Sequence, residues 1–263
     1  AGKNEEGLSI AGNRFNDAKG LSIFSTITDT QHKYLLLSKY DGDLKRSVVE
    51  LIDLSKRKII HIWKPNINKI ISQSKIPRNV VNLKRDSNLR RYQIVHPLLL
   101  KNGDLIIHGL ATPLTKIDKC SKEVWSLDYV FHHSTEQGNN SYWIPIIFFP
   151  SSVHHGLDET FGVKTKKFHD DGIMQVSNNG EVLFKKSIIQ MFIDNNLAGL
   201  IYGGREPTYD PIHLNDIQPV LEDGPYFKKG DLFLSSRNLS MIILYRPETN
   251  KIIKIIEGDF ISQ

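Results

Sequence analysis

Short runs of alternating apolar and polar residues recur along the chain, and turn residues separate them. A period of two is typical of strands that bury one face, so each run predicts a strand. The first group has DTQH, DGDLKR and SKR between its runs, which are residues 20–27, 33–40, 47–54 and 58–63. Four short strands per repeat of ~40 to 50 residues are the signature of a propeller blade. The pattern therefore predicts an all-β fold of the β-propeller class.

Two further groups of runs follow the same pattern. The second group comprises residues 92–100, 105–110, 114–118 and 123–127. The third begins in FHHSTEQGNNSYWIPIIFF and resumes across a turn, as residues 131–149, 172–176 and 181–185. Asn102-Gly103 and Asn179-Gly180 are strong turn signals between strands of these groups. Each group is therefore expected to form one blade.

Two segments depart from the strand pattern. Residues 150–171 are rich in Ser, His and Lys and predict a long loop. Residues 188–196 predict a helix between blades, because apolar side chains recur there with helical spacing. The residues on that apolar face are Ile188, Ile189, Phe192 and Ile193.

An internal repeat supports the blade interpretation. KNGDLIIHGLATPLTKIDKCSKEVW, from Lys101, aligns with KKGDLFLSSRNLSMIILYRPETNKIIKII, from Lys228. Both copies run turn, strand, short polar step, strand, turn and strand. We therefore expect residues 1–263 to form one β-propeller domain of about four to five blades. The chain is expected to be a piece of a longer protein, truncated at both ends.

Residues 209–238 gather the most unusual polar side chains. His213, Asn215 and Asp216 open the run HLNDIQPVL, and Arg237 lies in the run LFLSSRNLSMIILY. Read as one strand, the second run places Ser235 and Arg237 on the same face. A histidine, an amide and an arginine are then brought to one end of a hairpin, which suits an anionic group.

Histidines also recur at the starts of the predicted inner strands. His96, one of His132 and His133, and His213 occupy these positions in three blades. Inner strands line the central channel of a propeller, so these histidines are expected to meet at its mouth. His213 is suited to nucleophilic or acid/base chemistry, since an imidazole can do both near neutral pH. The competing interpretation is a histidine bonded to backbone groups at a strand end.

Arg237 interrupts an otherwise uncharged run, and an arginine in such a place needs a partner. A guanidinium offers a bidentate fork to sulfate, phosphate or carboxylate. The competing interpretation of Arg237 is a salt bridge to an acid such as Asp216.

Composition narrows the function classes. The net charge is +5, and the basic residues cluster at 75–91 and 164–167, which we interpret as solvated loops rather than a nucleic-acid surface. No apolar run approaches the ~20 residues that span a bilayer. Cys120 is the only cysteine, so an internal disulfide and a cysteine-based zinc site are excluded. No phosphate-binding loop, GxSxG or GxGxxG motif occurs.

A metal cluster of histidines and aspartates is the weaker alternative. Its candidate members are His132, His133, His154, His155, His169, Asp170 and Asp171. Their spacing matches no defined ligand set, and separated loop histidines are more often solvated. We therefore expect no metal held by protein ligands.

The stretch DPIHLNDIQPV, followed by GDLFLSSRNLSMIILYRPETNKIIKII, resembles the bacterial arylsulfotransferases that use no nucleotide sulfate donor. SKYDGDLKRSVVELIDLSKRKIIHIWKP and FHHSTEQGNNSYWIPI are similar to the same family. The resemblance implies a six-bladed propeller with its active site at the channel. It assigns sulfate binding to His213, Asn215, Arg237 and one of His132 and His133. The family's covalent histidine, in a QHD-like motif, is expected beyond Gln263.

The resemblance also implies a reaction. An aryl sulfate donates its sulfuryl group to a histidine, and a phenol then takes the group, without a cofactor. It implies an exported, periplasmic enzyme whose partners are small molecules, not nucleic acid. Two alternatives stay open: a non-catalytic propeller that binds an anionic ligand or protein, and a quinone-cofactor dehydrogenase. The second lacks the expected calcium-binding acids and repeated tryptophan motifs.

Overall fold

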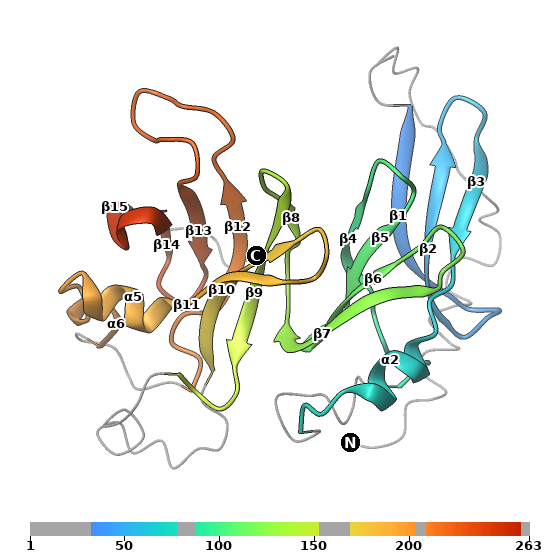
Figure 1. Cartoon of the computed structure of the whole chain (residues 1–263), viewed down its shortest axis with the longest axis horizontal. Coiled ribbons are helices and arrows are strands. Elements are labelled where there is room, and N and C mark those ends of the chain that lie inside the picture. The colour runs from blue at the N-terminus through green and yellow to red at the C-terminus, as the bar shows by residue number, and fades with distance from the viewer. Residues whose placement is uncertain (1–32, 78–87, 153–168, 203–208, 259–263) are drawn as a thin grey trace.

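The computed structural model describes residues 33–77, 88–152, 169–202 and 209–258, and these residues are predominantly β (Figure 1). Their strands form three antiparallel sheets of three, eight and four strands. We divide the eight-stranded sheet at the pairing of β7 with β9, which gives four units that we call blades one to four. The first blade contains β1 (Tyr34–Asp41), β2 (Arg46–Asp53) and β3 (Lys58–Trp63). The second contains β4 (Val95–Leu99), β5 (Leu105–His108), β6 (Thr112–Ile117) and β7 (Glu123–Phe131). Each blade is a meander of strands adjacent in sequence, as hairpin turns require.

The third and fourth blades repeat this design. The third contains β8 (Glu136–Gln137), β9 (Ser141–Phe148), β10 (Asp170–Ser177) and β11 (Val182–Ser187). The fourth contains β12 (Leu214–Pro219), β13 (Leu232–Ser236), β14 (Met241–Arg246) and β15 (Lys251–Glu257). In Figure 1 the opening strands β4, β8 and β12 lie between the last strand of the fourth blade, β15, at the left and the last strand of the first blade, β3, at the right. This arrangement confirms the prediction of a β-propeller.

The predicted turns between strands are present. Gly103 and Gly180 adopt φ of +86° and +85°, a conformation that favours glycine over other residues. The end of β7 also pairs with β9, through Val130 with Ile147 and Phe131 with Ile146. Hydrogen bonds therefore continue from the second blade into the third.

Apolar side chains fill the spaces between successive blades. Between blades one and two the core includes Val49, Trp63, Leu105 and Ile107. Between blades two and three it includes Ile106, Phe131, Ile144 and Met174, and between blades three and four Trp143, Ile173, Leu234 and Ile243. Full burial of such a side chain contributes roughly 1.5–3 kcal/mol. Packing between blades therefore fixes where each inner strand begins.

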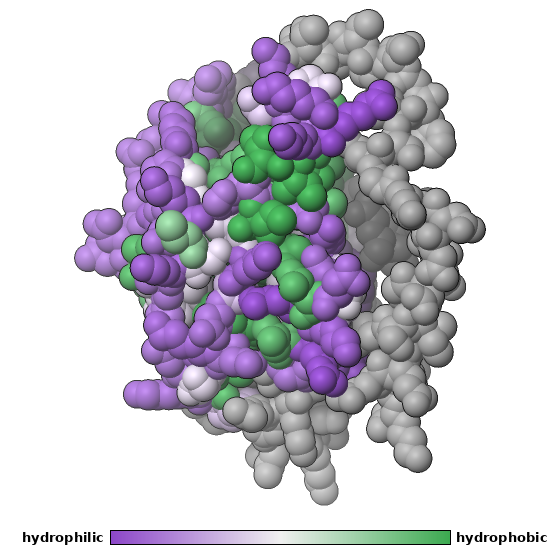
Figure 2. Space-filling view, turned by 90° about the vertical axis from the view of Figure 1, so that its right-hand side faces the viewer, coloured by the Kyte–Doolittle hydropathy of each residue, from purple (hydrophilic) through white to green (hydrophobic). Residues whose placement is uncertain are grey.

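The outer face of the first blade is less completely packed. Ile59, Ile60 and Ile62 of β3 are 44%, 48% and 37% exposed. Figure 2 views the molecule from this side and shows apolar side chains gathered on the surface among polar ones. Within the described residues, this face has no blade packed over it.

The predicted helix is confirmed as α5 (Ile188–Asp194), which packs between the third and fourth blades. The Ser187 hydroxyl caps it by accepting a hydrogen bond from the Gln190 N–H. Ile193 is 39% exposed, so it does not join the apolar face as expected. Short helices not predicted from the sequence are α2 (Ile67–Gln73), α6 (Gly199–Tyr202) and the 3₁₀ turn η1 (Pro247–Thr249).

Two expectations near the site are wrong. Residues 232–245 are a hairpin, not one strand, and Arg237 lies in its turn rather than on a strand face with Ser235. A hydrogen bond from the Ser240 N–H to the Arg237 carbonyl closes this turn. The predicted loop 150–171 also ends sooner than expected. Asp170 and Asp171 belong to β10 and are buried, because hydrogen-bond donors from other segments satisfy their carboxylates.

Several predictions fall outside the described residues. These are the strand at residues 20–27, most of the loop 150–171 with His154 and His155, most of the basic cluster 75–91, and the cluster 164–167. In the ranges that are described, no helix is both long and apolar enough to cross a membrane.

Close packing of blade three at Gly172 gives a test of the fold. A Cβ added there would lie 2.4 Å from Phe148 Cε2 and 2.6 Å from the Lys186 carbonyl oxygen. We expect Gly172→Ala to lower the free energy of unfolding by ~1–3 kcal/mol, because the backbone must shift. Gly42→Ala is the matched control, since no atom lies within 4 Å of its added Cβ. Urea unfolding measures both, and equal stability of the two variants would contradict this packing.

Candidate functional site

Three histidines from three blades share an unusual backbone conformation. His96, His133 and His213 have φ of 40°, 57° and 49°. His96 is the second residue of β4, His133 shortly precedes β8, and His213 directly precedes β12. Positive φ is uncommon for residues other than glycine and concentrates at functional sites. Each of the three blades therefore carries, near the start of its opening strand, a histidine with a strained backbone conformation.

Two of these histidines, from the third and fourth blades, are in contact. The rings of His133 and His213 lie edge to face, with centroids 5.2 Å apart. Burial is the main cause that lowers the pKa of His133 to about 4, and the charges of His213, Arg237 and His96 add to it. His133 is therefore neutral near pH 7, and the choice between His132 and His133 falls on His133 as the ring that faces His213.

Arg237 contacts the histidine cluster rather than Asp216. Its Nη2 lies 3.1 Å from His213 Nδ1, and its Nε donates to Asn238 Oδ1 at 3.2 Å. The backbone N–H of Arg237 also donates to the His213 carbonyl at 3.0 Å. Among the described residues, no salt bridge joins Arg237 to Asp216.

Asn215 lies in β12 of the fourth blade, two residues after His213 in the chain. It is half-buried, and the pairing of β12 with β13 shifts register between Leu214 and Asp216. Such bulges are common next to active sites.

Asp210 is a member of the cluster that sequence reasoning missed. Its Oδ2 accepts from His213 Nδ1 at 2.5 Å, and its Oδ1 accepts from the His213 N–H at 3.2 Å. His169 Nδ1 lies 3.9 Å from the same Oδ2. Burial raises the pKa of Asp210, but the hydrogen bond and charge of His213 and the charge of His169 leave it below its usual value. An aspartate three residues before a histidine was the available signal.

His132 and Asp171 form a buried pair behind His133. His132 Nδ1 lies 2.6 Å from His133 Nδ1, and His132 Nε2 lies 3.7 Å from Asp171 Oδ1. Burial is the main reason that the pKa of His132 falls well below its usual value, while the pKa of Asp171 rises well above. Burial thus disfavours the charged form of both groups in this pair.

His108, at the end of β5, was also missed. It is fully buried, with Nε2 3.0 Å from Thr135 Oγ1 and Nδ1 2.9 Å from the Gly109 carbonyl oxygen. Burial is the main cause that lowers the pKa of His108 to about 4, and the charges of His96 and His133 add to it. His108 thus supports the cluster from behind as a neutral ring.

The arrangement favours an anion over a metal ion. Arg237 is a permanent cation at the edge of a group of mostly neutral imidazoles, and the ring N–H groups and amides can donate hydrogen bonds. Among the described residues, no group of three or more His, Cys, Asp and Glu side chains could hold a metal ion. The chemistry available here is recognition of negatively charged oxygens.

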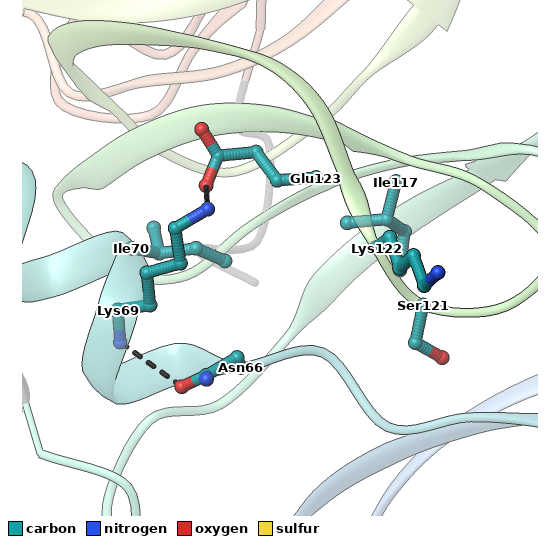
Figure 3. Close-up of a pocket in the computed structure, with 7 residues that line it drawn as sticks. All are labelled: Asn66, Lys69, Ile70, Ile117, Ser121, Lys122 and Glu123. Carbon is teal, nitrogen blue, oxygen red and sulfur yellow. Dashed lines mark hydrogen bonds and ion pairs between the residues drawn. The ribbon is translucent and has the colours of Figure 1, made fainter.

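A separate hollow of about 400 Å³ lies between α2 and the β6–β7 turn (Figure 3). Its lining residues are Asn66, Lys69, Ile70, Ile117, Ser121, Lys122 and Glu123. Lys69 pairs with Glu123 at 3.3 Å, and Asn66 caps α2 through the Lys69 N–H. None of the clustered histidines lines this hollow, and its charged groups already serve the local structure.

The buried neutral histidines predict a dependence of stability on pH. The unfolded chain protonates His108 near its ordinary pKa of ~6.5, whereas the folded chain protonates it only near pH 4. Between pH 6.5 and 4 the unfolded state therefore binds more protons than the folded state. Acidification in this window lowers the free energy of unfolding by up to ~1.4 kcal/mol per pH unit through His108. Asp171 has the opposite effect on stability. Its pKa is raised in the folded state, so above its unfolded pKa the folded state binds more protons and acidification stabilises the fold.

We therefore expect His108→Gln to unfold with a shallower loss of stability between pH 6.5 and 4 than the natural chain. Urea unfolding at several pH values measures the two curves. Parallel curves in this window would show that His108 is not held neutral by burial.

Several solved structures are similar to this chain. A quinohemoprotein alcohol dehydrogenase from Comamonas testosteroni is 13% identical with a TM-score of 0.46, over 86% of this chain and 33% of that one. The WD40 β-propeller of Doa1 is 8% identical, with a TM-score of 0.44 over 87% and 52%. The β-propeller of Cps50 (Swd1) from Myceliophteria thermophila is 9% identical, with a TM-score of 0.49 over 87% and 58%. This chain thus spans less than two thirds of each of these structures.

No curated protein sequence matches this chain. The family model described as Arylsulfotransferase (ASST) matches residues 96–262. That match covers more than half of the 263 residues and includes His96, His133, His213, Asn215 and Arg237. The resemblance seen in the sequence is thereby confirmed, and the chain belongs to the arylsulfotransferase family.

Proposed function

We propose that this protein transfers a sulfuryl group from an aryl sulfate to a phenol through a histidine intermediate. The observation that carries the proposal is the contact of Arg237 with His213, and of His213 with His133, at the inner ends of two blades. This places a permanent cation against two imidazoles from different parts of the chain. Membership of the family supports the reaction class.

Binding of the sulfate is assigned to Arg237, His133 and Asn215. The guanidinium Nε donates to Asn238 Oδ1, and Nη2 lies 3.1 Å from His213 Nδ1. The remaining N–H groups can offer a bidentate fork to two sulfate oxygens. Negative charge resides on those oxygens during transfer, and preorganised donors aimed at them stabilise the transition state.

The group transfer is assigned to histidine chemistry. In the first step a histidine nitrogen forms a bond to sulfur, the bond from sulfur to the aryl oxygen breaks, and the phenolate takes a proton from a second, acid/base histidine. In the second step the acceptor phenol gives its proton to that same histidine, its oxygen bonds to sulfur, and the bond from nitrogen to sulfur breaks. Because the resemblance expects the covalent histidine beyond Gln263, His213 is assigned the role of an acid/base group that also binds the sulfate.

The proposal includes no cofactor and no nucleic-acid partner, and it places the protein in the periplasm. The location rests on the family resemblance alone. Fractionation of cells that produce the full-length protein checks it, and recovery of the protein only from the cytoplasm would contradict it.

Turnover is the direct test of the proposed reaction. The full-length protein is expected to release the chromophore from a chromogenic aryl sulfate only when a phenol acceptor is supplied. Because the two substrates react in separate steps, initial-rate plots at several acceptor concentrations should be parallel lines. Binding of the aryl sulfate without turnover would instead support a non-catalytic propeller that recognises an anion.

Substitutions of Arg237 separate anion binding from a structural role. Arg237→Lys keeps the charge but loses the fork, so the rate is expected to fall by tenfold or more, since a charge-assisted pair is worth roughly 1.5–3 kcal/mol. Arg237→Ala should lose more activity than stability. Asp216→Ala is the matched control, because Asp216 makes no ion pair with Arg237 among the described residues. Equal losses of melting temperature and turnover in both arginine variants would contradict the proposal.

Removal of the His213 ring tests the transfer step itself. His213→Ala is expected to abolish turnover in the full-length protein. The melting temperature should change little, because the His213 ring is partly exposed and buries little apolar surface. Activity close to that of the natural protein would show that His213 takes no part in the reaction.

A further inference from the structure

We infer that Asp171 is a positioning residue that sets the spacing between His133 and His213, two histidines that are proposed to bind the sulfate. The inference rests on the proposed function for the identity of the anion. Asp171 is buried at the start of β10 in the third blade, and it acts on the anion only through these histidines.

One oxygen of the Asp171 carboxyl holds the start of the fourth blade. Its Oδ2 accepts a hydrogen bond of 2.7 Å from the backbone N–H of Leu214, the residue that follows His213. Leu214 opens β12, which is the edge strand of its sheet, and none of the described strands pairs with that edge. A buried backbone N–H needs an acceptor, and here the third blade supplies it. The bond therefore fixes the backbone next to His213 against the third blade.

The other oxygen of Asp171 faces the two adjacent histidines of the third blade. Oδ1 lies 3.7 Å from His132 Nε2, and His132 Nδ1 lies 2.6 Å from His133 Nδ1. The first distance is that of a polar contact, whereas the second is within the range of a hydrogen bond. The His132 ring thus lies between the Asp171 carboxyl and the His133 ring, so a shift of the carboxyl is passed on to His133.

The burial of a carboxyl at this place calls for an explanation. Burial raises the pKa of Asp171 and disfavours its charged form, and the charge of Asp210 adds to this effect. A small apolar residue could occupy the same place without that penalty. The two contacts of Asp171 supply a reason for the carboxyl, because together they join the His133 side of the site to the His213 side. The ring centroids of these histidines are 5.2 Å apart.

A purely structural role is the competing interpretation, and the preceding residue, Asp170, illustrates such a role. Asp170 is also buried in β10, but successive side chains of a strand point to opposite faces. Its carboxylate accepts from the Ser152 N–H at 2.7 Å and from the Ser187 hydroxyl at 2.5 Å. These bonds hold the ends of strands in the third blade and the residue that caps α5. Asp170 is therefore a matched control for Asp171.

The test measures the affinity of the full-length protein for toluenesulfonate, which has an anionic head but cannot transfer it. We expect Asp171→Ala to raise the Kd by about tenfold or more, because His133 and His213 are no longer held at the same spacing. Asp171→Asn keeps an acceptor for the Leu214 N–H, so most of the affinity should return. An unchanged Kd in Asp171→Ala would overturn the inference.

Asp170→Ala shows whether a general loss of stability explains the effect. It should lower the melting temperature at least as much as Asp171→Ala and leave the Kd for toluenesulfonate unchanged. An equal rise of the Kd in both variants would overturn the inference. If Asp171→Ala does not fold, His132→Leu breaks the same link with little change in side-chain volume. A raised Kd in that variant supports the inference, and an unchanged Kd overturns it.

A crystal structure of Asp171→Ala without ligand separates this inference from the proposed function. We expect the rings of His133 and His213 to lie further apart than in the natural protein. If the rings separate and the Kd rises but the natural protein turns over no aryl sulfate, the proposed reaction fails and the positioning role stands. If aryl sulfate is turned over while Asp171→Ala keeps both the ring spacing and the Kd, the positioning role is overturned and the reaction stands.

Discussion

Packing of apolar faces between successive blades is the constraint on which the rest of this structure depends. Trp63, Phe131 and Trp143 belong to three such interfaces. Each interface sets the position of one blade against the next and therefore the place where its opening strand begins. Residues that precede those strands are remote in sequence but adjacent in space. The contact between His133 and His213 is a consequence of this packing rather than of any local motif.

The site combines that geometry with a particular balance of charge. His108 and His132 are buried and neutral, so they surround the cluster without adding positive charge. Arg237 supplies one permanent cation, and Asp210 supplies an anion on the far side of the His213 ring. Attraction for an anionic group is therefore concentrated on one side of one imidazole.

Much of this could be predicted from the sequence, and the failures have physical causes. The period-two runs and Asn-Gly turns predicted the blades, and the helical spacing at residues 188–196 predicted α5, because these signals are local. The helix α2 also had a local signal, Asn66 before Ile67 and Ile70, although the run was short. Arg237 was placed on a strand because its turn shows no glycine or proline. Asp171 and His108 could not be assigned, because only contacts with distant segments bury them.

The central claim is that the His133, His213 and Arg237 cluster binds the sulfuryl group of the substrate. The most direct test is a crystal structure of the full-length protein with an aryl sulfonate, which keeps the anionic head but cannot transfer it. We expect the sulfonate oxygens to lie within hydrogen-bond distance of the Arg237 guanidinium and of the His133 or His213 ring. The aryl group should point toward the channel. Binding of the sulfonate elsewhere, such as in the hollow beside Lys69 and Lys122, with the cluster unoccupied, would contradict it.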